Sequence, residues 1–109
     1  MKEIRFRFQN YAWGFNQDES HIISFLNKTY SHFNKGVYDE TIPLPDNLLQ
    51  QICELFAGIY REFPKDEFAW DAPMWTLTID DKTCTRIASK ESDPVYAKVS
   101  RIFEAFKAK

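Results

Sequence analysis

The sequence contains few of the residues that build the common catalytic motifs: its 109 residues include three glycines, two cysteines and two histidines. Three glycines are too few for a phosphate-cradling loop, and the sequence has no nucleophile elbow, metalloprotease helix or Cys-x-x-Cys pair. No segment approaches the roughly 18 apolar residues that a membrane-spanning helix needs. We therefore expect a protein that is not an enzyme, with no catalytic residues, no cofactor and no metal site.

The first residues argue against a secretory signal. Residues 2–9 alternate polar and apolar side chains, whereas a signal peptide has a continuous apolar region. This favours a cytoplasmic protein in which Cys53 and Cys84 are reduced. A disulfide between them is the alternative. Cys53 lies in the apolar stripe of a predicted helix, where we expect a small buried hydrophobe; a catalytic thiol is the alternative there.

Hydrophobic periodicity predicts the strands. A chain of this length with 44% hydrophobic residues should form one domain over residues 1–109. Period-two alternation over 2–9 and again over 75–79 predicts half-buried strands. Asp80, Asp81 and Lys82 then form a tight turn into a second strand of a hairpin. Segment 37–45, which contains two prolines, is predicted as a loop or a short edge strand.

Apolar residues at spacings of three and four predict three helices. The first covers 21–34, the second begins at an N-cap Asp46 and ends before Pro64, and the third begins at Asp93 and Pro94. Gly58, inside the second helix, suggests close packing against a neighbour. The predicted fold is α+β, roughly β-α-α-β-β-α, with helices on one face of a small antiparallel sheet.

The two histidines fall in the first predicted helix. His21 and His32 are eleven residues apart, which places them on a similar helix face but ~16 Å apart along the axis. At that separation they could not share a metal ion, and each is predicted to be a surface or boundary residue.

The charge is unevenly distributed along the chain. Segment 36–81 has ten acidic and two basic side chains, a net charge of −8, although the whole chain has −2. Such a segment repels nucleic acid and attracts basic surfaces, and the 17% aromatic content suggests exposed contact residues. A solvated face that only aids solubility is the alternative. The predicted partner-binding residues are Asp39, Glu40, Asp66, Glu67, Trp70 and Asp71.

These features favour a non-enzymatic protein-binding module, a monomer or weak homodimer that binds neither nucleic acid nor membrane. The most specific form of this hypothesis is an immunity protein that neutralises a basic, nuclease-type toxin through an acidic, aromatic-rich surface. One alternative is a small enzyme such as a Mg²⁺-dependent nuclease, because Asp80 and Lys82 have the acidic-x-Lys spacing of such sites. Another is a phage-type structural or assembly subunit that dimerises through exposed aromatic residues.

Overall fold

The computed structural model describes all residues except 12–13, 15, 70 and 108–109. The described chain forms six strands and two helices. The strands are β1 (Glu3–Asn10), β2 (Gln17–Ser24), β3 (Thr29–Asn34), β4 (Val37–Pro43), β5 (Met74–Ile79) and β6 (Lys82–Ile87). The helices are α1 (Asp46–Arg61) and α2 (Pro94–Lys107).

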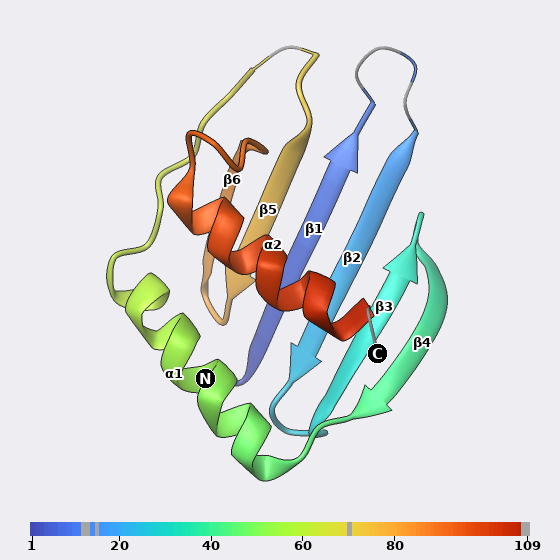
Figure 1. Ribbon diagram of the computed structural model, residues 1–109, viewed down its shortest axis with the longest axis vertical. Helices are drawn as coiled ribbons and strands as arrows, with labels where there is room; N and C mark the ends of the chain where they lie inside the picture. Colours follow the sequence, from blue (N-terminus) through green and yellow to red (C-terminus); the bar gives the residue numbers. More distant parts are fainter. Residues whose placement is uncertain (12–13, 15, 70, 108–109) are drawn as a thin grey trace.

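All the strands belong to one antiparallel sheet in the order β4-β3-β2-β1-β5-β6. Figure 1 shows both helices on the same face of this sheet, with α2 crossing in front of the central strands. The opposite face is polar at its centre, where Arg5, Arg7, Thr76 and Thr78 surround a shallow hollow. The α+β class and the placement of the helices on one face are confirmed.

The helix predicted over 21–34 is wrong, because this segment forms β2, a turn and β3. The helical stripe counted Leu26 as buried, but Leu26 is 87% exposed at the turn. The turn is made by residues that favour turns: Ser24 Oγ accepts a hydrogen bond from the Asn27 backbone N–H at 3.1 Å, and Lys28 adopts a left-handed φ of 57°. The side chains that were assigned to one helix face instead divide between two strands.

The turn between β3 and β4 is built by two residues with positive φ angles. Gly36 lies with Lys35 in the two-residue connection between β3 and β4. Their φ angles are 76° and 53°, and two successive positive φ values are typical of the type I′ turn that suits a hairpin. The edge strand anticipated in 37–45 is confirmed as β4.

The two predicted helix starts have different outcomes. Asp93 caps α2 as predicted, since its Oδ1 accepts from the backbone N–H groups of Val95 and Tyr96 at 3.2 and 3.3 Å. Asp46 is instead the first residue of α1, after an N-cap at Pro45 that makes no side-chain cap hydrogen bond. A methyl group added at Gly58 would meet no atom within 4 Å, so the expected close packing there is wrong.

Phe103 of α2 is at the centre of the core between the helices and the sheet. Its ring centroid lies 5.2 Å from that of Phe6 on β1, 5.1 Å from His21 on β2 and 6.2 Å from Phe56 on α1. Burying aromatic rings in such contacts is a large part of what holds a small domain together. One of these core neighbours is a histidine, and this leads to the candidate site.

Candidate functional site

His21 and His32 are directly opposite each other on β2 and β3, contrary to the expectation that they lie ~16 Å apart on a helix. Their ring centroids are 4.9 Å apart and each residue is 4% exposed. Strand pairing brings them together because partners across an antiparallel ladder point to the same face of the sheet. The predictions that they are surface or boundary residues and could not share a metal are therefore wrong.

Each imidazole is held through its Nδ1 atom. His21 Nδ1 lies 2.6 Å from the hydroxyl oxygen of Tyr30, which is fully buried on β3. His32 Nδ1 lies 2.7 Å from Asp39 Oδ2. Burial, followed by the nearby carboxylates of Glu40 and Glu19, raises the pKa of Tyr30, so its phenol stays protonated at neutral pH.

A bulge in β4 places Asp39 against His32. The pairing register of β3 with β4 shifts after His32, which pairs with Glu40, to Phe33, which pairs with Tyr38. Asp39 is the extra residue between these two pairs. A bulge re-aims a side chain out of the regular alternation, and here it turns a carboxylate toward a buried imidazole.

Glu19 completes the group from β2. One ligand atom each of Glu19, His21 and His32 lies within 4.8 Å of the others, so these three residues could hold a metal ion. Glu19 Oε1 is 3.8 Å from His32 Nε2, which is too long for a hydrogen bond. His32 Nε2 is buried without a hydrogen-bond partner. We call these three residues the His–Glu cluster.

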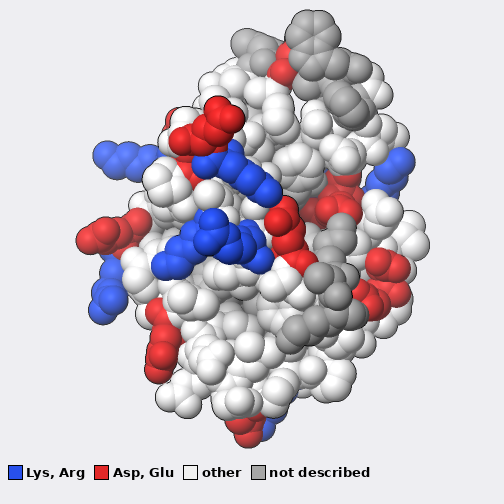
Figure 2. All heavy atoms as spheres, in the orientation of Figure 1, with Lys and Arg blue, Asp and Glu red and all other residues white. Residues whose placement is uncertain are grey.

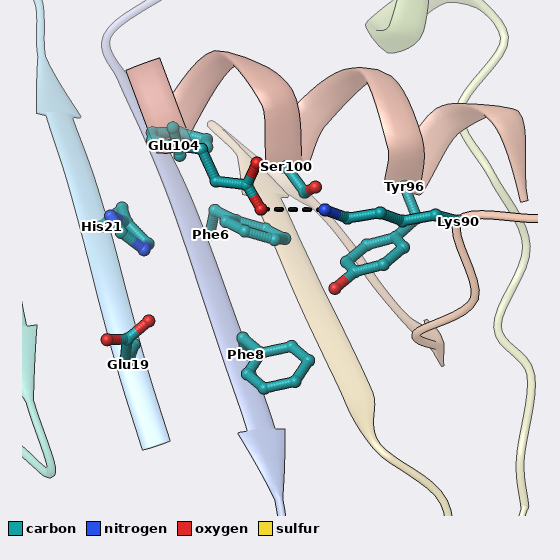
Figure 3. A pocket seen from close by; sticks show the side chains of 9 residues that line it. Phe6, Phe8, Glu19, His21, Lys90, Tyr96, Ser100 and Glu104 are labelled. Carbon is teal, nitrogen blue, oxygen red and sulfur yellow. Dashed lines mark hydrogen bonds and ion pairs between the residues drawn. The ribbon is translucent and has the colours of Figure 1, made fainter. Parts of the chain in front are cut away.

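A cavity of about 200 Å³ adjoins the cluster beneath α2. Figure 3 shows Glu19 and His21 on β2 beside Phe6 and Phe8 on β1. From the helix side the cavity is lined by Tyr96, Ser100 and the ion pair in which Lys90 Nζ lies 2.9 Å from Glu104 Oε1. The Ser100 hydroxyl is buried without a hydrogen-bond partner. The unpartnered hydroxyl of Ser100 therefore lines the same cavity as Glu19 and His21.

The six predicted partner-binding residues do not form one group. Asp39 and Glu40 lie on the edge strand β4, whereas Asp66 and Glu67 lie beside β6, the other edge of the sheet. The two edge strands are five inter-strand spacings apart, which is roughly 24 Å. Asp71 belongs to the loop before β5, and Trp70 lies outside the described residues. On the face in Figure 2 the acidic groups are scattered over the surface, several of them beside basic groups.

Asp66 and Glu67 have structural contacts. Asp66 Oδ1 accepts the backbone N–H of Thr85 at 2.9 Å, and the backbone N–H of Glu67 donates to the Thr85 carbonyl, also at 2.9 Å. The Glu67 carboxylate lies 3.4 Å from Arg86. Asp66 and Glu67 therefore bind the outward backbone groups of Thr85 on the outer edge of β6.

The opposite edge is open. Every residue of β4 except Ile42 is exposed, and Val37 and Tyr38 are 69% and 60% exposed. Within the described part of the chain, the sheet order ends at β4 and no further strand pairs with it. The described chain thus binds the outward backbone groups of Thr85 at the β6 edge and leaves the β4 edge exposed.

The residues of the nuclease alternative are engaged in local contacts. Asp80 Oδ1 accepts the backbone N–H groups of Lys2 and Glu3 at 2.7 and 3.1 Å. Lys82 Nζ donates to the Tyr60 carbonyl at 2.9 Å and lies 4.1 Å from the centroid of the Tyr60 ring. These contacts fix the hairpin turn to the chain start and to α1, but they do not test the enzyme hypothesis.

Both cysteines are free thiols. Cys84 is buried on β6, where burial raises its pKa to about 11, and Cys53 is half-buried on α1. A nucleophilic thiol needs the opposite shift, toward a lower pKa, so the environment of Cys84 is that of a structural residue.

Comparison with known proteins gives no match: no family model, curated protein or solved structure matches this chain. Neither α1 nor α2, the two helices of the described residues, is long and apolar enough to cross a membrane.

Proposed function

We propose that this protein is a non-enzymatic binding module that holds a segment of a basic partner protein along the open edge of β4. The single observation that carries the proposal is the contrast between the two edges of the sheet: Asp66 and Glu67 bind Thr85 at the β6 edge, whereas six of the seven residues of β4 are exposed. An exposed edge strand is a template on which another chain can add a strand.

Hydrogen bonding along β4 leaves backbone groups available for that strand. The backbone N–H of Leu44 donates to the Lys28 carbonyl at 2.8 Å. In an antiparallel ladder hydrogen-bonded pairs alternate, so Ile42 and Glu40 also bond toward β3, and Thr41 directs its N–H and C=O outward. A partner strand would meet these outward groups.

The charge of the edge favours a basic partner over a second copy of the chain. Asp39 and Glu40 would repel the same carboxylates of another copy paired edge to edge, whereas lysine or arginine side chains on a partner would be attracted. The exposed apolar surface of Val37 and Tyr38 adds contact area. Asp66, Glu67 and Asp71 are too distant to join this surface, so the proposal is narrower than the acidic surface expected from the sequence.

A toxin-neutralising immunity protein is the most specific form of this proposal. A small protein that presents carboxylates along a strand edge suits the basic groove of a nuclease domain, and electrostatic attraction would speed the association. We place the protein in the cytoplasm, where two free thiols remain reduced.

The test is binding to a basic toxin domain encoded by the adjacent gene, measured by isothermal titration calorimetry. Thr41→Pro removes the outward N–H without removing a backbone bond to β3; like Thr41→Val, it loses the hydrogen bond between the Thr41 and Ser31 hydroxyls at 2.9 Å. We expect Thr41→Pro to weaken binding at least tenfold. Thr41→Val keeps that N–H and is the matched control, with binding within about twofold of wild type.

A second comparison tests the charge. Glu40→Lys should weaken binding at low salt, and the loss should shrink as salt increases. Glu54→Lys makes the same charge change on the exposed side of α1 and should have little effect. The proposal is wrong if Thr41→Pro and Glu40→Lys both bind the partner as tightly as the wild-type protein.

A further inference from the structure

The His–Glu cluster has the composition of a transition-metal site. Two imidazoles and one carboxylate are the ligands of many catalytic zinc sites, in which a fourth position stays open to water or substrate. Nitrogen donors favour zinc and its neighbours, whereas Mg²⁺ and Ca²⁺ prefer oxygen ligands alone. We propose that Glu19, His21 and His32 together bind one zinc-like divalent ion.

The distances suit a single ion after a small adjustment. Zinc binds nitrogen and oxygen at about 2.0–2.2 Å, so two ligand atoms at a tetrahedral angle lie about 3.4 Å apart. His32 Nε2 and Glu19 Oε1 are 3.8 Å apart, and the widest separation in the cluster is within 4.8 Å. The Glu19 side chain is 32% exposed, so it can rotate toward the two imidazoles when an ion binds.

The buried nitrogen of His32 is the second observation that points to a ligand. A buried polar atom that makes no hydrogen bond costs about 1–3 kcal/mol, and native proteins rarely leave one in that state. His32 Nε2 is such an atom, and it faces Glu19. An ion between these two groups satisfies the nitrogen, and the carboxylate offsets its charge.

The outer contacts of both imidazoles match those of metal-binding histidines. Such a histidine usually donates its second ring N–H to a carboxylate or another oxygen, which fixes the tautomer and the ring orientation. Asp39 accepts from His32 Nδ1 in this arrangement, and the Tyr30 oxygen does the same for His21 Nδ1. The β4 bulge, which otherwise only disturbs the edge of the sheet, thereby gains a role in positioning His32.

The cavity beneath α2 supplies the open coordination position. Glu19 and His21 line both the cluster and the cavity, and the Ser100 hydroxyl is available to a water or a small polar ligand on the ion. Figure 3 shows Phe6 and Phe8 forming the apolar wall of the same cavity. The site thus has the features of an open, ligand-accepting centre instead of a closed structural one.

Titration of the untagged protein with Zn²⁺, and separately with Mg²⁺, tests the proposal. We expect one Zn²⁺ per chain and no Mg²⁺ binding by calorimetry. His32→Phe and Glu19→Gln should each weaken Zn²⁺ binding at least 100-fold. Asp39→Asn should weaken it 10- to 100-fold, as is typical for an outer-contact residue. Glu54→Gln removes an exposed carboxylate of α1 outside the cavity and should bind Zn²⁺ like the wild-type protein.

The spectra of the imidazole nitrogens provide a readout that does not depend on the folding of any variant. The chain has only two histidines, so ¹⁵N-imidazole NMR reports on this site alone. Zn²⁺ should shift one nitrogen of each ring at one equivalent. The proposal is overturned if the wild-type protein binds no stoichiometric Zn²⁺, if its imidazole signals do not move, or if Glu19→Gln binds Zn²⁺ unchanged. Because no partner protein is present, these results are independent of the β4 proposal.

Discussion

The imidazoles of His21 and His32 pack against each other across the β2–β3 ladder, 4.9 Å apart and tilted by 40°. Both rings are inside the core, and each is oriented by one oxygen-bearing neighbour, Tyr30 or Asp39. A buried polar pair of this kind stabilises one arrangement of the core only if its hydrogen bonds are made, since each lost partner leaves a desolvated nitrogen.

Tyr30→Phe should therefore destabilise the protein. The substitution keeps the ring and its contacts but removes the hydroxyl from His21 Nδ1, and we expect unfolding to become easier by about 1–3 kcal/mol. Urea denaturation monitored by tryptophan fluorescence measures this difference. Tyr38→Phe removes an exposed hydroxyl on β4 and should change stability by less than about 0.5 kcal/mol. Equal stabilities for Tyr30→Phe and wild type would mean that the buried hydrogen bond contributes nothing.

The sequence predicted the elements whose periodicity agrees with their burial. β1, β5, α1 and α2 were recognised because each buries one regular face, and the α2 start was located by its Asp93-Pro94 pair. β2 and β3 were missed because Ile22, Phe25 and Leu26 surround a turn and imitate a helical stripe. The available signal was the pair of turn-forming residues Ser24 and Asn27 between two short alternating segments.

The candidate site was missed for the same reason. A metal cluster across two strands has no fixed spacing in sequence, because the turn length decides which residues face each other. Once β2 and β3 are recognised as a hairpin, His21 and His32 follow as a pair. The contact between Asp39 and His32 could not be predicted, because it depends on the bulge in β4. The residue types in this segment do not show where a bulge falls.

Asp93 links the start of α2 to β6, and its removal should be costly. Its Oδ1 caps the helix, and its Oδ2 accepts from Arg86 Nε at 2.9 Å while the residue is buried. Asp93→Ala loses the cap and the charged hydrogen bond to Arg86, which keeps only Glu67 and the Lys65 carbonyl as partners, so we expect a loss of about 2–4 kcal/mol.

Two further variants separate these contributions. Asp93→Ser restores a capping oxygen without a charge and should recover about 1 kcal/mol of the loss. Arg86→Met removes the other partner of the ion pair. Chemical denaturation of the single and double variants gives the coupling energy. Additive effects for Asp93→Ser and Arg86→Met would contradict a direct interaction.

The two thiols should react at very different rates in the folded protein. Burial raises the pKa of Cys84 to about 11, so almost none of it is thiolate at pH 8, and its sulfur is also inaccessible. Native protein treated with a thiol reagent should show one faster-reacting thiol, and two only after denaturation. Cys53→Ser should remove the faster phase and Cys84→Ser should retain it. A faster phase that persists in Cys53→Ser would contradict the burial of Cys84.

Asp80 anchors the start of β1 and should make stability depend on pH in the acid range. Burial raises its pKa, but the backbone N–H groups of Lys2 and Glu3 outweigh that effect, and the net pKa in the folded state is below 3.8. A carboxyl with a lowered folded pKa contributes stability that is fully present above its unfolded pKa. That contribution is lost as the pH falls through the folded value.

Asp80→Asn tests this directly, because asparagine tolerates the left-handed φ of 52° at this position and keeps an acceptor oxygen. The variant should be less stable than wild type at pH 7 by about 1 kcal/mol, the difference between a charged and a neutral acceptor. The gap should be constant down to about pH 5 and should narrow below pH 4, as Asp80 of the wild-type protein becomes protonated. Urea denaturation at pH 7, 5 and 3 measures it, with Glu54→Gln on the exposed side of α1 as the control carboxylate. If the gap were as large at pH 3 as at pH 7, its source would be the changed side-chain shape and not the anchored charge.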